Sequence, residues 1–455
     1  MIQSFIHITE NKNSYIFDDH NRLSMLIHPE LRKIHEKSID IDSYYLKKYE
    51  YLRNHNFFSN PKVVNFESLD ESMVEKSIIN TKQIIFEVTD FCNLNCTYCG
   101  YGELYEGYDI RNRKNINIGN AINLLKYIFD NRPVSNKNKL IIGFYGGEPL
   151  LNIKFIKMIV EVANQLISEK EMDIEYSMTT NATLIHKYID FLVANKFQLL
   201  ISLDGNKDNH SYRVFSKNNK NSFHKVIENI DMIQQDYPKY FSEYVSFNAV
   251  LHNRNSVKEI YEFIYLRYQK IPQISELVLK DMTQDNIEHV KKIFQSKRKS
   301  ETEYQQEGSN LLPHKELILY RELTDFITNY SINFYISNLN SLLYEGEKYL
   351  PTDTCIPFNR RVFFTTNNKL LPCEKINNKY SMGQVNPDVN IDISEITRQY
   401  NSHYNHFKKI CQYCYDYRAC GSCMFFMGNL GKLGTAEFVC DHFQNKNAFI
   451  STLTH

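Results

Sequence analysis

The sequence predicts an α/β fold built on a largely parallel sheet, followed by a loop-rich region that holds most of the cysteines. Between Thr81 and Met282, apolar strand-like runs alternate with amphipathic helix-like runs. Such alternation is typical of parallel strands joined by right-handed helical crossovers. Three of the ten cysteines follow the first strand of this region closely, and the other seven lie beyond residue 350.

Six strands and five helices are expected in the α/β region. The expected strands are Ile84–Asp90, Leu140–Gly146, Ile174–Thr180, Leu199–Asp204, Val245–Leu251 and Ser275–Lys280. The expected helices are Ile118–Asn131, Lys154–Glu169, His186–Asn195, Ser222–Gln235 and Ser256–Tyr268. Six strands with helices between them suit a partial (β/α)6 barrel, but an ordinary doubly wound sheet fits the same alternation.

The remaining chain divides into an N-terminal extension over 1–80, a bridge over 283–349 and a cysteine-rich domain over 350–455, with the α/β core at 81–282. The extension contains a predicted hairpin over Ser14–Ile27, then helices at Pro29–Lys37 and Ser43–His55. The polar stretch 283–312 is expected to be a solvated helix and loop, and a helix is predicted at Leu317–Tyr330.

Bulk composition excludes several classes of protein. Lys plus Arg and Asp plus Glu both total 53, so no global basic field points to nucleic acid or an anionic membrane. No apolar run approaches the length of a membrane-spanning helix, and the N-terminus shows no secretion signal. We therefore expect a cytoplasmic protein whose cysteines are ligands rather than disulfides.

The most informative motif is the cysteine triplet Cys92, Cys96 and Cys99, spaced C-x3-C-x2-C. It supplies three thiolates where a cubane iron–sulfur cluster needs four, which leaves one iron open for chemistry. The triplet follows a strand closely, at the edge where α/β folds place their active sites. A structural zinc site is the alternative, but zinc prefers four protein ligands and no nearby His or Cys completes the set.

This triplet resembles the cluster signature of radical S-adenosylmethionine (SAM) enzymes. The resemblance implies that SAM chelates the open iron, and that an electron cleaves it to a hydrogen-abstracting 5′-deoxyadenosyl radical. Gly146, Gly147 and Glu148, in Gly-Gly-Glu-Pro, match the family motif that meets the amino group of SAM. Tyr98 stands where the family packs an aromatic or apolar residue near adenine.

Three more polar positions resemble contacts to SAM in this family. Asn181 lies in Thr-Thr-Asn-Ala-Thr, where Ala182 replaces the family's glycine, and Ser202 lies in Ile-Ser-Leu-Asp-Gly. Turn or capping roles explain these two residues equally well. Arg213 stands where the family often pairs an arginine with the SAM carboxylate, although a surface ion pair is an equal alternative.

The seven C-terminal cysteines resemble the SPASM domain, which carries two auxiliary [4Fe–4S] clusters. The resemblance assigns one fully ligated cluster to Cys411, Cys414, Cys420 and Cys440. It assigns a second cluster, with three protein ligands, to Cys355, Cys373 and Cys423. Two departures stand out. Asn368 replaces a family glycine, although both residues tolerate positive φ, and the last spacing within the core motif is x2 rather than x3.

The resemblance implies a cytoplasmic peptide maturase that crosslinks or otherwise oxidises a ribosomally made precursor peptide. Glu374 would accept a proton beside the radical site, or would be a surface carboxylate. The expected partners are the precursor and an electron donor such as flavodoxin or ferredoxin, with no nucleic acid and no membrane. The N-terminal extension would be a peptide-recognition element or a packing extension. The alternatives are a sulfatase-type oxidase that forms formylglycine, or a non-catalytic electron-transfer protein.

Overall fold

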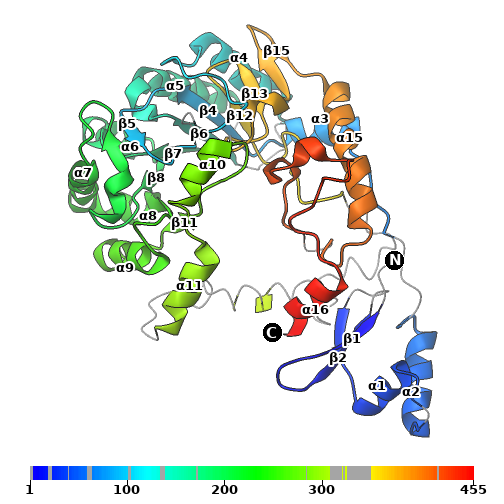
Figure 1. The fold of residues 1–455 in the computed structure, drawn as a ribbon. Coiled ribbons are helices and arrows are strands. Elements are labelled where there is room, and N and C mark those ends of the chain that lie inside the picture. The colour runs from blue at the N-terminus through cyan, green and yellow to red at the C-terminus, as the bar shows by residue number, and fades with distance from the viewer. Residues whose placement is uncertain are drawn as a thin grey trace. The chain divides into compact units, whose positions relative to one another are not determined.

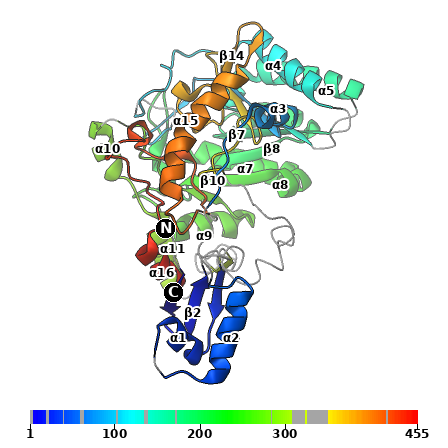
Figure 2. The same ribbon diagram turned by 90° about the vertical axis from the view of Figure 1, so that its right-hand side faces the viewer.

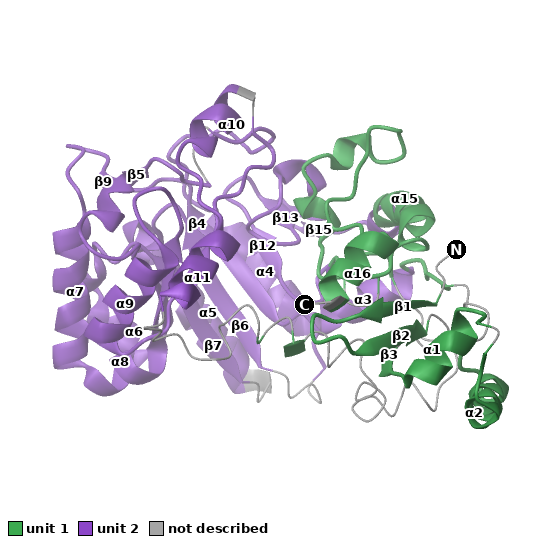
Figure 3. Ribbon diagram, turned by 60° about the horizontal axis from the view of Figure 1, so that its bottom comes forward, with its two compact units in different colours: residues 1–69, 313–354, 398–455 green, residues 70–312, 355–397 purple. Residues whose placement is uncertain are grey.

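The computed structural model describes residues 4–18, 23–38, 40–58, 64–100, 104–133, 139–170, 173–282, 284–307, 320, 323–324, 350–417 and 420–454. The chain forms two compact units, drawn in green and purple in Figure 3. Unit 1 comprises residues 1–69, 313–354 and 398–455, and unit 2 comprises residues 70–312 and 355–397. Within the described part of the chain, no helix is both long enough and apolar enough to cross a membrane.

Unit 2 is built on one ten-stranded sheet, in the order β11-β10-β8-β7-β6-β4-β12-β13-β14-β15. Its first six strands are mutually parallel and follow each other in chain order, which confirms the predicted α/β architecture. They are β4 (Gln83–Thr89), β6 (Leu140–Gly146), β7 (Ile174–Thr180), β8 (Gln198–Ser202), β10 (Val245–Val250) and β11 (Gln273–Ser275). The last strand, β11, ends at Ser275, the residue at which its predicted range Ser275–Lys280 begins.

The helices between these strands lie close to their predicted ranges (Figure 1). They are α4 (Ile118–Asn131), α5 (Ile153–Lys170), α6 (Ile189–Ala194), α7 (Phe223–Asp236) and α9 (Val257–Tyr268). Helix α8 (Pro238–Tyr244), between α7 and β10, was not predicted from the sequence. The predicted helix His186–Asn195 is divided into a short 3₁₀ turn and α6. Several helices begin at a side-chain cap, as Asn117 and Ser256 show by accepting a backbone N–H within α4 and α9.

The two faces of β4 have different roles, because successive side chains on a strand point to opposite sides. Phe86 contacts the rings of Phe144 and Phe155, so its face packs against neighbouring strands and α5. Ile85, on the other face, packs with Phe363 and Leu371. This second face also carries Glu87, and it is the face on which the candidate site lies.

The region beyond residue 350, predicted to be loop-rich, also adds short strands to the large sheet. Strand β12 (Val362–Phe364) pairs in parallel with β4, and three antiparallel strands continue the sheet. These are β13 (Lys369–Leu371), β14 (Gly383–Val385) and β15 (Val389–Asn390). Helix α15 (Ile393–Cys411) follows, with Ile396, Tyr400, Tyr404 and Phe407 buried along one face. The short strands escape a periodicity search, whereas the stripe on α15 is visible in the sequence.

The predicted bridge is described only in its first half. Helices α10 (Gln284–Lys291) and α11 (Lys297–Gln306) occupy the stretch expected to be a solvated helix and loop. Ser300, Glu301 and Tyr304 on α11 are nevertheless buried, so one side of this helix packs on the protein. The predicted helix at Leu317–Tyr330 lies almost entirely outside the described residues.

In unit 1 the N-terminal residues form a three-stranded antiparallel sheet of β1 (Phe5–Ile8), β2 (Ser14–Asp18) and β3 (Leu23–Leu26). The β2–β3 pair is the predicted hairpin, and α1 (Pro29–His35) and α2 (Ser43–Asn54) follow it side by side (Figure 2). The C-terminal helix α16 (Lys446–Thr454) packs on this sheet through a cluster of Phe5, Phe17, Tyr415, Phe449 and Leu453. The four predicted domains and the three boundaries between them stay predictions.

Candidate functional site

The cysteine triplet lies in a loop that two neighbouring strands hold in place. Cys92 follows the end of β4, and Cys96 ends the short strand β5 (Leu94–Cys96). Strand β5 pairs antiparallel with β9 (Arg213–Phe215), which places Cys96 directly opposite Arg213. The turn from Cys96 to Cys99 is closed by a backbone hydrogen bond of 3.1 Å between those two residues.

The three thiols lie close enough to influence one another. Burial, then the charge of Glu148 and that of Cys99, raise the pKa of Cys92 to about 12. Burial also raises the pKa of Cys96, and the thiols of Cys99 and Cys92 add to that effect. Iron cations would remove this penalty, because a thiolate is stabilised by the metal it binds. The donor set therefore fits a cationic metal cluster.

The arrangement suits a cubane better than a single ion. Among the described residues, no three His, Cys, Asp or Glu side chains converge to hold one metal ion. A cubane binds each thiolate to a different iron and so requires wider spacing than zinc does. Two N–H groups also approach the Cys92 sulfur, from Leu94 at 3.4 Å and from the Asn181 amide at 3.7 Å. Such hydrogen bonds stabilise a metal-bound thiolate.

Two glycines allow the end of β6 to approach the cysteine loop. The Gly147 N–H donates to Thr89 O at 2.8 Å, and the Glu148 N–H donates to Phe91 O at 3.0 Å. A Cβ on Gly147 would lie 2.1 Å from Phe91 O, and Gly146 adopts a φ of +121°. No other residue fits these two positions without moving the backbone. The Gly-Gly-Glu-Pro segment is thus attached directly to the loop that carries the cysteines.

Glu148 joins this segment to the end of β7. Its side chain is fully buried and accepts hydrogen bonds from the Asn181 N–H at 2.8 Å, the Thr180 hydroxyl at 2.8 Å and the Leu150 N–H at 3.1 Å. Burial raises the pKa of Glu148 to about 7, against these three donors. In the structure Glu148 therefore organises the ends of two strands through its own carboxylate.

Asn181 connects the end of β7 to the cysteine loop. Its amide donates to Asn93 Oδ1 at 2.9 Å, and its Oδ1 accepts from the Thr183 N–H and hydroxyl at 3.0 and 2.7 Å. Ala182 is fully buried with a φ of +61°, the conformation for which glycine is preferred. The turn that the family builds with glycine is thus kept in this chain with alanine.

Arg213 is engaged in a buried ion pair rather than a surface one. Its Nε and Nη2 donate to the two carboxylate oxygens of Asp204 at 2.8 and 3.1 Å. Burial alone would raise the pKa of Asp204, but Arg213 and then His252 hold it well below its usual range. Tyr98 donates its hydroxyl to the same carboxylate and stacks on His252.

This network ties the loop between the second and third cysteines to the strands beneath it. Tyr98 is 6% exposed and Asp204 is fully buried, so the tie is protected from solvent. Asp204 belongs to the Ile-Ser-Leu-Asp-Gly motif, but the sequence did not reveal that it pairs with Arg213. Ser202 ends β8 opposite Asn248 of β10, at the same edge of the sheet as Asn181.

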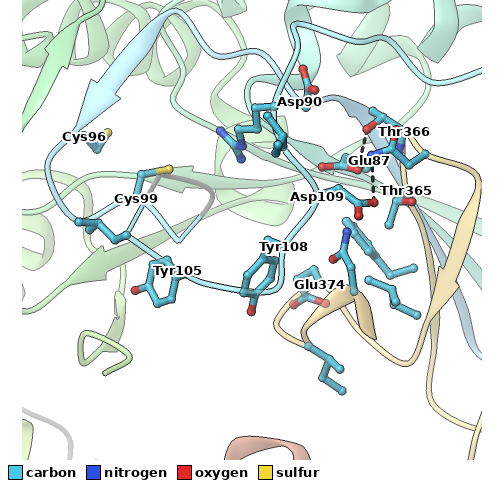
Figure 4. A pocket seen from close by; sticks show the side chains of 18 of the residues that line it. Glu87, Asp90, Cys96, Cys99, Tyr105, Tyr108, Asp109, Thr365, Thr366 and Glu374 are labelled. Carbon is cyan, nitrogen blue, oxygen red and sulfur yellow. Dashed lines mark hydrogen bonds between the residues drawn. The ribbon is translucent and has the colours of Figure 1, made fainter. Parts of the chain in front are cut away.

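A cavity of about 610 Å³ opens beside the cysteine loop, within the ~300–1,000 Å³ typical of small-molecule sites. Figure 4 shows Cys96 and Cys99 at one end, and Glu87 and Glu374 toward the other. The structure therefore brings Glu374 to the same cavity as two of the three triplet cysteines. Glu374 accepts two hydrogen bonds from Arg361 Nη1, at 3.1 and 2.9 Å, and so already has a counter-charge.

Unit 1 brings together four of the C-terminal cysteines. Burial raises the pKa of Cys411, and the thiols of Cys414, Cys420 and Cys440 add to the effect. Cys411 ends α15, and the Cys414 sulfur accepts the Gln444 N–H at 3.4 Å. These four thiols are the set that the resemblance assigned to one auxiliary cluster.

The other three C-terminal cysteines are divided between the units. Cys355 and Cys373 lie in unit 2, and Cys423 lies in unit 1. Asn368 adopts a φ of +63°, so the turn before Cys373 is kept although the family glycine is absent. The assignment of these three thiols to one cluster stays a prediction.

Comparisons with known proteins agree with the geometry of unit 2. The sequence model of the radical SAM superfamily matches residues 86–264, which include the cysteine triplet and the Gly-Gly-Glu-Pro segment. A cysteine-type anaerobic sulfatase-maturating enzyme of Clostridium novyi (strain NT) is 32% identical over 177 residues, which cover 38% of this chain and 44% of the relative. A radical SAM cyclopropyl synthase of Paramaledivibacter caminithermalis is 28% identical over 177 residues, covering 37% and 35%.

A solved structure extends the similarity beyond the matched domain. It is described as native anSMEcpe with bound AdoMet and Kp18Cys peptide, and it superposes with a TM-score of 0.52 at 18% identity. The superposition covers 82% of this chain and 94% of that chain, and at this identity it shows the fold alone. The sequence matches themselves span less than half of either curated relative. We therefore identify residues 86–264 of this chain as a radical SAM domain.

Proposed function

We propose that this radical SAM protein is a peptide maturase, which abstracts a hydrogen atom from a ribosomally made precursor and installs a crosslink or another oxidative modification. The observation that carries the proposal is the cavity, which joins Cys96 and Cys99 to Glu374 within one space of about 610 Å³. A side chain of a peptide fits such a volume, whereas an electron carrier needs no substrate cavity beside its cluster.

The residues of the site have separate roles in this proposal. Cys92, Cys96 and Cys99 would hold a [4Fe–4S] cluster, which when bound supplies the electron that splits SAM to a hydrogen-abstracting radical. Gly147 and Glu148 would present their backbone to the amino end of SAM, since glycine there leaves no side chain in the way. These roles rest on the family resemblance and on the geometry of the loop.

Glu374 would receive the proton that the oxidised substrate releases. Its carboxylate lines the cavity and is held by Arg361 at 2.9 Å, so its position is fixed before substrate arrives. A base must lie within hydrogen-bond reach of the proton it removes, and a fixed carboxylate on the cavity wall meets that condition. Two auxiliary clusters on the C-terminal cysteines would accept the electron, and flavodoxin or ferredoxin would reduce the SAM cluster.

The N-terminal element of unit 1 would bind the precursor. Among the residues that the structure describes, β3 is an edge strand of this sheet and pairs with β2 alone. An open strand edge can accept a peptide as an additional strand. Leu26 on β3 and Tyr44 and Tyr51 on α2 are 64%, 63% and 61% exposed, and exposed apolar side chains of this size are typical of interaction surfaces. If the N-terminal element served only to pack against the rest of unit 1, these exposed apolar side chains would have no role.

The proposal is tested by anaerobic reconstitution and coexpression. Reduced protein with SAM should release 5′-deoxyadenosine, and replacement of Cys92, Cys96 and Cys99 by Ala should abolish it. Coexpression with a small open reading frame next to the gene should give a peptide two hydrogen atoms lighter for each crosslink, as tandem mass spectrometry measures. Replacement of Cys411 and Cys414 by Ala should leave deoxyadenosine release but stop the mass change. Deoxyadenosine without any change in the peptide contradicts the maturase proposal.

A sulfatase-maturating oxidase is a second candidate, because 177 residues are 32% identical to such an enzyme of Clostridium novyi. The position of Glu374 on the cavity wall suits this reaction as well. A synthetic peptide with a sulfatase motif separates the two candidates, since conversion of its cysteine to formylglycine supports the oxidase. An unchanged peptide in a preparation that releases deoxyadenosine excludes that substrate.

A further inference from the structure

Glu87 is a buried carboxylate on the wall of the cavity. It has no role in the proposed binding of the cluster or of SAM. It is 7% exposed and lies on β4, three residues before Asp90, at the end of the cavity away from the cysteines (Figure 4). The neighbouring Gly146 leaves room for it, because a Cβ on that glycine would lie 3.3 Å from Glu87 Cγ. The chain thus keeps a charge inside a strand whose other central residues are apolar.

The two oxygens of this carboxylate are in different situations. Oε2 accepts the Thr366 N–H at 2.8 Å and the Thr366 hydroxyl at 3.2 Å, which fixes the side chain. No residue that the structure describes donates a hydrogen bond to Oε1. Glu87 lines the cavity, and a carboxylate oxygen accepts hydrogen bonds, so Oε1 is an acceptor that a molecule bound in the cavity would complete.

The other carboxylates of the cavity wall have partners in hand. Glu374 pairs with Arg361 at 2.9 Å, and Asp109 pairs with Lys369 at 2.7 Å. Asp90 accepts two backbone N–H groups, at 2.9 and 2.7 Å. Glu87 is therefore the acid of this wall with an oxygen left for a ligand, although the charge of Arg111 also acts on it.

A cation is the ligand that best suits this position. A buried carboxylate gains most from a charged donor, because a charge-assisted hydrogen bond is roughly twice as strong as a neutral one. Burial raises the pKa of Glu87 in the absence of a ligand, which is the expected consequence of insufficient counter-charge. The rings of Tyr105 and Tyr108 also line the cavity, Tyr105 near Cys99 and Tyr108 toward Glu374 (Figure 4), and aromatic faces attract cations.

We propose that Glu87 selects a basic side chain, a lysine or an arginine of the peptide substrate, at the carboxylate end of the cavity. The inference rests on the proposed function, because it assumes that a peptide enters this space. It goes further in naming the chemistry of one substrate residue. That residue would lie in the cavity together with Cys96 and Cys99, so it belongs to the modified region rather than to a distant docking segment.

The absence of tryptophan from the chain provides the assay. A peptide acetyl-Gly-Trp-Gly-Lys-Gly-amide then carries the only indole in the sample, and its fluorescence anisotropy reports binding to the anaerobic, SAM-loaded protein. Peptides with norleucine or glutamate in place of lysine are the comparison. We expect the lysine peptide to bind at least about tenfold more tightly than the norleucine peptide, as a charged hydrogen bond warrants.

Variants locate the preference. Glu87→Gln keeps the size of the side chain and an acceptor for Thr366, and it should reduce the lysine preference to within about twofold. Glu75→Gln on the exposed side of α3 (Glu71–Ile79) is the matched control and should keep the full preference. Thr366→Val removes the hydroxyl that donates to Glu87 but leaves the charge of Glu87 in place. This variant should therefore still bind the lysine peptide more tightly than the norleucine peptide. Circular dichroism and iron content show whether each variant is folded and loaded.

The outcomes separate this inference from the proposed function. Equal binding of lysine and norleucine peptides to the wild type, no binding of the lysine peptide at about 10 mM, or an unchanged preference in Glu87→Gln overturns the inference. The wild-type comparison decides the matter if Glu87→Gln does not fold. Release of 5′-deoxyadenosine is measured on the same preparation. A preparation that releases no 5′-deoxyadenosine contradicts the proposed function. The comparison of peptides still measures whether Glu87 selects a basic side chain.

Discussion

The buried pair of Asp204 and Arg213 makes the sharpest prediction about stability. Replacement of Asp204 by Ala removes a fully buried carboxylate that accepts two hydrogen bonds from Arg213, at 2.8 and 3.1 Å. It also removes the acceptor of the Tyr98 hydroxyl and of the Val250 N–H, the latter at 3.0 Å. The guanidinium of Arg213, only 7% exposed, would then have lost its counter-charge.

The cost follows from these contacts. Breaking a buried ion pair by removing one partner costs about 3–5 kcal/mol, because the remaining charge stays out of water. An orphaned buried donor costs about 1–3 kcal/mol more, although such effects do not add fully when the groups share one network. We therefore expect Asp204→Ala to lower the free energy of unfolding of unit 2 by at least about 4 kcal/mol, a large part of the stability of an ordinary domain.

Urea unfolding of the metal-free protein, followed by far-ultraviolet circular dichroism, measures this loss. The double variant Asp204→Leu with Arg213→Met removes both charges and should recover at least about half of it, since a buried pair exchanged for apolar side chains is often close to neutral. Asp208→Ala, at an exposed carboxylate nearby, should change stability by less than about 0.5 kcal/mol. A loss below about 1 kcal/mol in Asp204→Ala, or a double variant as unstable as the sum of its parts, would refute the reasoning.

Three further predictions concern the site itself. Gly147→Ala should destabilise the apoprotein by about 2 kcal/mol or more and abolish SAM-dependent change in the spectrum of the reduced cluster, because its Cβ would lie 2.1 Å from Phe91 O. Gly431→Ala, with nothing within 4 Å of the added Cβ, should match the wild type, and equal behaviour of the two variants would contradict the close approach. Burial raises the pKa of Glu148 to about 7 from 4.5, so the folded state holds this proton more tightly than the unfolded chain does. The stability of the wild type relative to Glu148→Gln should therefore fall by about 3 kcal/mol as pH rises from about 4.5 to above 7, and parallel urea results across that range would show the carboxyl to be ordinary. Glu374→Gln should leave 5′-deoxyadenosine release within about twofold but slow product formation about 10²-fold or more, and equal slowing of both would remove its role as a proton acceptor.

Much of unit 2 was predictable because local patterns decide it. Runs such as Leu140–Gly146 and Ile174–Thr180 are apolar, bounded by breakers and followed by amphipathic stripes, and their observed limits match the predicted ones. The cysteine triplet and the Gly-Gly-Glu-Pro segment each lie within one short stretch of the sequence, so both motifs could be recognised without the structure. Asn368 was also understandable in advance, because asparagine tolerates the positive φ that it adopts.

The features that the sequence did not reveal depend on pairing between distant segments. Strand β12 has only three residues, and its place beside β4 follows from a contact between positions 362 and 84. The sequence left two partners possible for Arg213, the SAM carboxylate or an acidic residue of the protein. No local pattern indicates that Asp204 lies close to Arg213 in the folded chain. The stripe on α15 is the exception, since Tyr400, Tyr404 and Phe407 recur at helical spacing and could have been read.

The pairing of β12 with β4 also explains which residues line the cavity. Strand β4 supplies Glu87 to one wall, and the turn between β12 and β13 supplies Thr366, which holds that carboxylate at 2.8 Å. Because β12 pairs with β4 in parallel, the end of β12 reaches the same edge of the sheet as the cysteine loop. The added strands thus do more than extend the sheet. They bring Glu374 and the anchor of Glu87 to a radical SAM site that the core strands alone would leave without either, so a change in β12 or β13 should alter substrate selectivity before it alters SAM cleavage.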